Sequence, residues 1–179
     1  MLRRLMLSVS CVLLAYSVPV AAGAQATAMG DAGLAAMHGQ WKQVTGFISR
    51  AADAMPEADY AYKPVATVRT FGQLLAHVAG AQASICAVAL GEKETPEDAV
   101  EKGTMTKASV TAALKSSSAI CDRAYAQGSA DVTKPAQLFG DTMTRGSALA
   151  LNAVHNGEHY GNIVTYMRMK GMVPPSSQR

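Results

Sequence analysis

The stretch from Leu149 to Lys170 has the periodicity of a buried helix, and it contains two histidines four residues apart, His155 and His159. Side chains at this spacing stack on one face of an α-helix. At about 100° per residue, the side chains predicted to point in the same direction as His155 are Ala148, Leu151, Asn152, His159, Asn162, Tyr166 and Met169. The pattern therefore predicts an inward-facing pair of imidazoles, which is half of a metal site; the alternative is two core histidines that each bond a backbone carbonyl.

Three other segments also have helical periodicity and clear ends. Thr70 and Gln73 form a capping-box pattern at the start of one helix, and Gly91 follows its last apolar residue. Pro56 ends the helix before it. The four predicted helices lie between Asp31 and Pro56, between Thr70 and Gly91, from Lys107 to Ala126, and from Arg145 to Lys170.

No stretch combines two-residue alternation with flanking turn signals, so no strand is predicted. The expected fold class is all-α, a four-helix bundle with long connections. Those connections, roughly 56–69, 91–105 and 127–143, are longer than bundles usually need, and each is long enough to cross the bundle. Loop length therefore does not fix the topology, and loops meeting at one end could wall a pocket.

The first 24 residues have the features of a cleavable signal peptide. Arg3 and Arg4 precede an apolar run from Leu5 to Val20, and Ala22-Gly23-Ala24 forms a small-x-small cleavage site. The run is shorter than the roughly 20 residues of a membrane helix, so secretion is favoured over anchoring. We expect a mature domain over 25–179 in the periplasm or outside the cell, without stable membrane attachment and as a monomer or a homodimer.

Charge and cysteine content narrow the function further. Removal of Arg3 and Arg4 leaves 14 basic against 13 acidic side chains, which gives no electrostatic support for nucleic-acid binding. Cys86 and Cys121 are the cysteines of the mature chain, and an oxidising compartment favours a disulfide between them. Unpaired thiols or metal ligands are the alternatives, although Cys86 lies about 180° around the helix from His77.

His77 is the expected third ligand, because it lies on the inward face of a helix with a good core pattern. A divalent ion held by three neutral nitrogens keeps an open position for water or substrate, and zinc in such a site lowers the pKa of bound water to about 7. His38 lies near the start of its helix and is interpreted as a surface or cap-region residue.

Other metal motifs fit less well. The segment from His155 to His159 also matches the H-x-x-E-H pattern of inverted zinc proteases, with Glu158 as general base. Those enzymes need a downstream carboxylate ligand, and no Asp or Glu follows His159. A di-iron bundle would need paired Glu-x-x-His motifs, and haem attachment would need C-x-x-C-H; neither occurs.

The segments Thr70 to Ala79 and His155 to Arg168, together with Trp41 in the first helix, resemble the DinB-like family of metal-binding four-helix bundles. The resemblance covers nearly all of the mature chain. It implies that His77, His155 and His159 bind a divalent metal, usually zinc or nickel. It also implies small-molecule chemistry, since the better understood members are thiol-dependent transferases and isomerases.

The chain differs from those relatives in carrying an export signal. The low-molecular-weight thiols that they use are mainly cytoplasmic, which disfavours a thiol-dependent role. We therefore expect an exported metal-dependent hydrolase or transferase acting on a small molecule, with a thiol-dependent transferase or isomerase as a less favoured outcome. A non-enzymatic metal-binding or structural bundle is the competing class. Asn162 and Gln73 are candidate supports for the ligands, and Glu158 is expected to be a solvated carboxylate.

Overall fold

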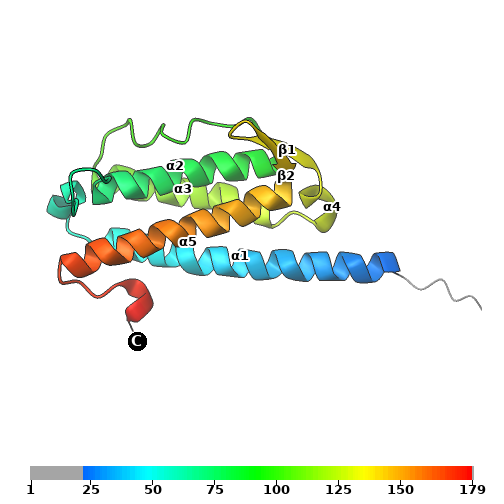
Figure 1. The fold of residues 1–179 in the computed structure, drawn as a ribbon, viewed down its shortest axis with the longest axis horizontal. Coiled ribbons are helices and arrows are strands. Elements are labelled where there is room, and N and C mark those ends of the chain that lie inside the picture. The colour runs from blue at the N-terminus through cyan, green and yellow to red at the C-terminus, as the bar shows by residue number, and fades with distance from the viewer. Residues whose placement is uncertain (1–21, 179) are drawn as a thin grey trace, which may run out of the picture.

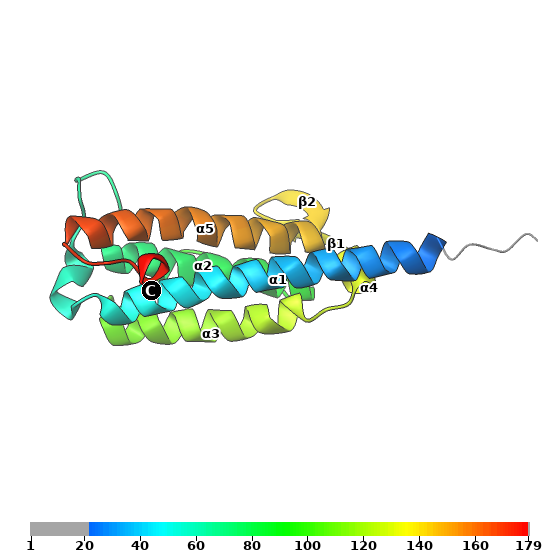
Figure 2. The same cartoon turned by 90° about the horizontal axis from the view of Figure 1, so that it is seen from below.

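The computed structural model describes residues 22–178, in which four long helices run along a common axis (Figure 1). The long helices are α1 (Ala22–Ala54), α2 (Phe71–Leu90), α3 (Lys107–Tyr125) and α5 (Arg145–Met169). α3 and α5 each pack against both α1 and α2, so that α1 and α2 lie on one diagonal of the bundle (Figure 2). The four-helix bundle predicted from periodicity is confirmed.

The helices end where local chemistry requires it. Thr70 accepts a hydrogen bond from the backbone N–H of Gln73, whose side chain accepts one from Thr70 N, which completes the predicted capping box of α2. The helix stops at Gly91, whose φ of 82° is the left-handed conformation that glycine adopts without strain. Thr106 and Ser109 cap α3 in the same reciprocal way.

The segment between α2 and α3 is a crossover that runs back along the bundle. Gln127, just after α3, donates to Ala89 O near the end of α2, so the two helices run parallel. Lys107, at the start of α3, donates to Asp53 O at the opposite end, where α1 finishes. The chain from 91 to 106 therefore returns the whole length of α2 before α3 begins (Figure 1).

Most of α2 is buried, because neighbours cover it on several sides. It is long and apolar enough to cross a membrane. However, 83% of its most apolar 18-residue stretch is buried in the bundle, as for a core helix of a folded domain. Large side chains that fill the surrounding core include Trp41, Phe71, Leu75, Ile85 and Leu149.

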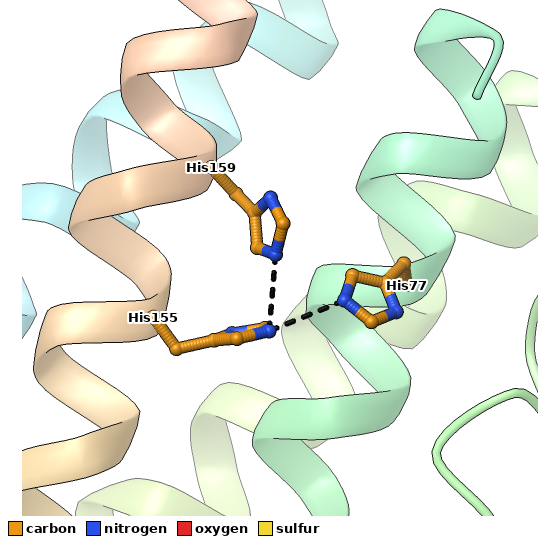
Figure 3. Close-up of side chains that lie close together, drawn as sticks. All are labelled: His77, His155 and His159. Atoms are coloured by element: carbon orange, nitrogen blue, oxygen red, sulfur yellow. Dashed lines mark hydrogen bonds between the residues drawn. The ribbon is translucent and has the colours of Figure 1, made fainter. Parts of the chain in front are cut away.

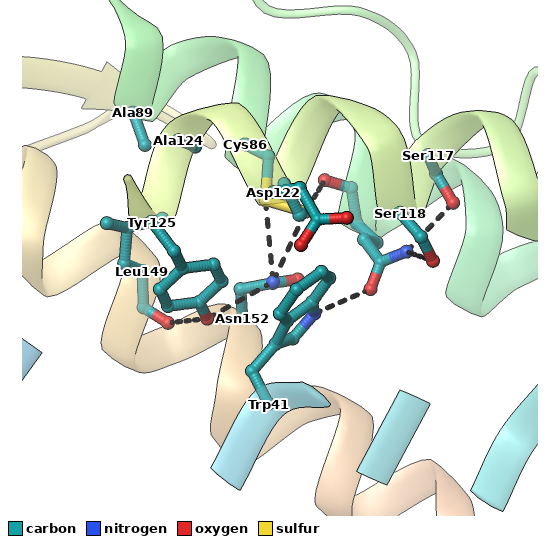
Figure 4. The surroundings of a disulfide bond; sticks show 12 residues. Trp41, Cys86, Ala89, Ser117, Ser118, Asp122, Ala124, Tyr125, Leu149 and Asn152 are labelled. Atoms are coloured by element: carbon teal, nitrogen blue, oxygen red, sulfur yellow. Dashed lines mark hydrogen bonds between the residues drawn. A yellow bond between two sulfur atoms is a disulfide. The ribbon is translucent and has the colours of Figure 1, made fainter. Parts of the chain in front are cut away.

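A disulfide between Cys86 and Cys121 joins α2 to α3 with Cα atoms 5.0 Å apart, which confirms the predicted pairing. It lies beside a buried polar group in which the Asn152 amide faces both sulfurs and Tyr125 donates to Leu149 O (Figure 4). The bridge therefore cross-links the two helices inside the bundle, and neither cysteine is free to bind a metal.

The last connection is more ordered than predicted. It holds a short helix α4 (Ser129–Val132) and an antiparallel hairpin of β1 (Pro135–Leu138) and β2 (Asp141–Thr144), so the all-α prediction is wrong for this segment. Each strand has four residues, and of these only Leu138 is buried, so there is too little alternation to detect. Phe139 and Gly140 turn the hairpin with positive φ angles of 54° and 87°.

The remaining differences are at the ends of elements. α1 begins at Ala22, nine residues before Asp31, the start expected from apolar spacing. The predicted signal peptide lies outside the described residues except for Ala22-Gly23-Ala24, which form the start of α1. Two short 3₁₀ helices, Glu57–Ala61 and Pro175–Ser177, follow α1 and α5.

Candidate metal centre

The imidazoles of His77, His155 and His159 converge between α2 and α5 (Figure 3). His155 Nε2 lies 3.2 Å from His77 Nε2 and 3.0 Å from His159 Nε2. One nitrogen from each ring lies within 4.8 Å of the others. The three residues predicted as ligands are therefore brought together, with the same nitrogen of each ring directed to one region.

This arrangement fits a metal ion better than it fits three core histidines. Nitrogens bound to one tetrahedral zinc at about 2.0–2.1 Å lie about 3.3–3.4 Å apart. The two short Nε2 separations, 3.0 and 3.2 Å, are close to that value. Without an ion, Nε2 atoms that face one another must either share protons or oppose their lone pairs.

Burial keeps the three imidazoles in the neutral form that binds metals. Desolvation is the main cause that lowers the pKa of His77, with the nearby charge of Arg69 adding to it. Desolvation also lowers the pKa of His155 and brings the pKa of His159 to about 4, and the neighbouring histidines contribute to both shifts. All three rings are therefore ready to act as neutral ligands at pH 7.

The Nδ1 atom of each ring points away from the other two rings, and its surroundings differ among the three histidines. His77 Nδ1 lies 3.4 Å from Glu101 Oε2, and a carboxylate in this position orients a ligating histidine in many metal sites. His159 Nδ1 lies 3.5 Å from the Asn162 amide, whose oxygen can face the ring after an amide flip. His155 Nδ1 has no polar group recorded at a comparable distance, and neither it nor His77 Nδ1 makes a hydrogen bond that satisfies the geometric criteria among the described residues.

Glu101 was not predicted as part of the site. It belongs to the crossover, which lies against α2 at Gly80. A Cβ added to Gly80 would lie 1.9 Å from Glu97 O, so the crossover can pass this close only because the residue is glycine. Glu101 also accepts hydrogen bonds from Arg69 Nε at 2.9 Å and Nη2 at 3.3 Å. The only sequence signals were a glycine one turn after His77 and acidic residues in a long connection, and neither specifies a contact.

The other candidate residues fall in different places. Asn162 lies beside the triad as predicted, whereas the Gln73 side chain caps α2 and makes no hydrogen bond to the histidines. Glu158 is exposed, as expected for a solvated carboxylate. His38 stacks on Tyr125 and Trp41 and lies 3.5 Å from Asp122, within the half of the bundle that holds the disulfide.

The predicted inward direction of α5 is partly wrong. Leu151 and Met169 are 38% and 56% exposed, while Asn156 and Ile163 are fully buried. The helix is rotated so that the histidines lie at the edge of its buried face. That rotation leaves His155 and His159 half-buried and gives the triad an accessible side.

A pocket of about 530 Å³ adjoins His159. Its other lining residues come from the segment before α2, from α2 and from the end of α5: Thr67, Val68, Arg69, Leu74, Asn162 and Tyr166. Such a pocket is large enough for a small organic molecule next to the triad.

Comparison with known proteins agrees with this architecture. A family model described as the DinB superfamily matches residues 40–163. No curated protein matches the chain. Among solved structures, a DinB-like protein from Bacillus cereus ATCC 10987 superposes with a TM-score of 0.67 at 18% identity, covering 78% of this chain and 93% of that one.

Two further structures have the same fold. A DinB-like protein from Bacillus subtilis gives a TM-score of 0.61 at 18% identity, with 80% of this chain and 99% of that chain covered. A mutant of a mycothiol-dependent maleylpyruvate isomerase gives 0.62 at 19% identity, covering 73% of this chain and 60% of the isomerase. At these identities the likeness concerns the fold alone.

Proposed function

The chain belongs to the DinB superfamily, and from this membership and the site geometry we propose that it is an exported metalloenzyme that hydrolyses or transfers a group on a small molecule. His77, His155 and His159 would hold one divalent ion, and the observation that carries the proposal is the convergence of their Nε2 atoms. Zinc or nickel suits a set of three imidazoles. Export remains a proposal from the sequence of the first 24 residues.

A divalent ion held by these three histidines would supply a Lewis acid for the reaction of a small molecule. The protein's own contribution is orientation. Glu101 faces His77 Nδ1 and favours the tautomer whose Nε2 carries the lone pair, and Asn162 can do the same for His159. The pocket beside His159 provides walls that exclude water from one side of a bound molecule.

A thiol-dependent transferase or isomerase is the second candidate, because one structure with this fold is a mycothiol-dependent isomerase. An exported protein would be separated from the cytoplasmic thiol pools, which favours hydrolysis. A non-enzymatic metal-binding bundle is the third outcome. The accessible pocket beside the triad argues against it, since a purely structural ion needs no opening. An inverted-motif protease is disfavoured because Glu158 is exposed and no carboxylate follows His159.

Metal content is the first test. The purified protein should contain one zinc or nickel per chain by elemental analysis, and a His155→Gln, His159→Gln double variant should lose it. His38→Gln is the matched control, because His38 is the remaining histidine and stacks away from the triad. Unchanged metal content in the double variant would show that the ion binds elsewhere.

Activity is the second test. Ester, amide and electrophile panels should be compared with and without a low-molecular-weight thiol, using metal-loaded and chelated protein. Turnover by the loaded protein without thiol supports the hydrolase. Turnover only with thiol supports the transferase or isomerase, and tight metal binding without turnover supports the non-enzymatic bundle. Mass analysis of the exported protein would test cleavage after residue 24.

A further inference from the structure

We propose that Arg69 forms an anion-binding subsite beside the histidine triad and that the substrate is a small carboxylate with an apolar portion. This inference deepens the proposed function, since it places the anion next to the proposed metal. It rests on the lining of the pocket, the hydrogen bonds of Arg69 and the charges around the site.

The pocket combines one charged side chain with polar and apolar ones. Arg69 is its only cationic lining residue, and no Asp or Glu lines it among the described residues. Val68, Leu74 and the ring of Tyr166 supply apolar surface, and Asn162 supplies an amide. A ligand that matches these walls carries a negative head group at one end and hydrocarbon at the other.

Arg69 is held in place before any ligand arrives. Its Nε and Nη2 donate to the carboxylate of Glu101, and Tyr166 OH donates to the backbone oxygen of Arg69 at 2.7 Å. These contacts fix the guanidinium and its backbone, so that less conformational freedom is lost when a ligand binds.

The hydrogen bonds to Glu101 use only one edge of the guanidinium. The end of the guanidinium, made by Nη1 and the second hydrogen of Nη2, has no acceptor among the described residues, and the side chain is 43% exposed. Two parallel N–H groups on one edge match the two oxygens of a carboxylate. Arg69 can therefore hold Glu101 and a carboxylate ligand at the same time.

The placement of charge around the pocket also favours an anion. Arg69 lines the pocket, whereas its partner Glu101 is not one of the lining residues. A carboxylate would therefore be attracted to the exposed part of the guanidinium, and a cationic group would be repelled there.

Binding of butyrate and of its uncharged analogue butyramide would test the subsite by titration calorimetry on the zinc-loaded protein. We expect butyrate to bind at least tenfold more tightly than butyramide. Arg69→Gln should weaken butyrate binding by about tenfold or more, which is the range of a charge-assisted hydrogen bond. Arg168→Gln, an equal charge change at an exposed position of α5 that does not line the pocket, should leave it unchanged.

Zinc-free protein separates the subsite from direct coordination of butyrate by the metal. There the Arg69→Gln variant should still bind butyrate more weakly than the wild type. Equal binding of butyrate and butyramide would refute the proposal, as would equal losses in Arg69→Gln and Arg168→Gln. A protein that takes up no zinc but keeps Arg69-dependent butyrate binding would refute the metalloenzyme and retain the subsite. Thermal unfolding and, where zinc binds, zinc stoichiometry of Arg69→Gln would confirm that the variant is folded.

Discussion

Replacement of Gly80 by alanine should weaken metal binding from a distance, through the crossover. A Cβ at this position would lie 1.9 Å from Glu97 O and 2.9 Å from Glu97 C, which are backbone atoms that no rotamer change can move. A normal carbon–oxygen contact is about 3.3 Å or more, so the crossover would have to retreat by about 1.4 Å. Glu101, four residues further along, would be carried away from His77 Nδ1.

Two magnitudes follow from this displacement. Overpacking costs about 1–3 kcal/mol, and the gain in helix propensity from glycine to alanine offsets about 1 kcal/mol of it. The net loss in the free energy of unfolding is therefore about 0–2 kcal/mol. Loss of a partner that orients a metal ligand lowers metal affinity by about 10–100-fold, so zinc affinity is the more sensitive measurement.

The assay is competition with a chelator for zinc, together with urea unfolding of the metal-free protein. Gly39→Ala is the matched control, because Gly39 is also inside a helix and an added Cβ there meets no atom within 4 Å. We expect the control to stabilise the protein by about 0.5–1 kcal/mol and to leave zinc affinity unchanged. If Gly80→Ala behaves like Gly39→Ala in both measurements, the crossover does not position the site.

The disulfide and the histidines each give a prediction about stability. Cys86→Ser with Cys121→Ser opens a loop of sequence separation 35 and should cost about 4 kcal/mol in urea unfolding, without loss of zinc stoichiometry; a cost below about 1 kcal/mol would contradict the cross-linking role. Burial and the neighbouring histidines lower the pKa of folded His159 to about 4, below the unfolded value of about 6.5. The metal-free protein should therefore lose stability as the pH falls through this range, by about 1–2 kcal/mol from this residue after allowance for solvent screening. Between pH 7.5 and 4.5 the free energy of unfolding should fall less in His159→Gln than in the wild type. Equal decreases would show that His159 does not cause this pH dependence.

The sequence was sufficient for those features that depend on local patterns. The ends of α2 could be predicted from Thr70 and Gly91, because these residues bond the unpaired N–H and C=O groups at the helix ends without help from distant segments. The triad followed from helical phase and the family resemblance. The disulfide followed from the expected compartment and from the position of Cys86 opposite His77.

Other contacts between distant segments had no such signal in the sequence. Glu101 reaches His77 only because the crossover lies against Gly80, and nothing near Glu101 in the sequence indicates that contact. The hairpin at 135–144 has strands too short for alternation to be read. The rotation of α5 also arises from tertiary packing, which helical phase alone does not reveal. Leu151, which phase placed on the inward face, is 38% exposed, and Asn156, which was not placed there, is buried.

Gln82 explains why the triad forms at this level of the bundle. Its buried side-chain oxygen accepts from Trp41 on α1 at 2.9 Å and from Asn156 on α5 at 2.7 Å, and its nitrogen donates to Ser117 on α3 at 2.9 Å. One amide on α2 therefore bonds all of the other long helices, and a slip of one helical turn would leave buried polar groups unpaired. Asn156 directly follows His155, and Gln82 lies five residues after His77. The bonds that fix the register of α2 against α5 thus also fix the level at which the histidines meet.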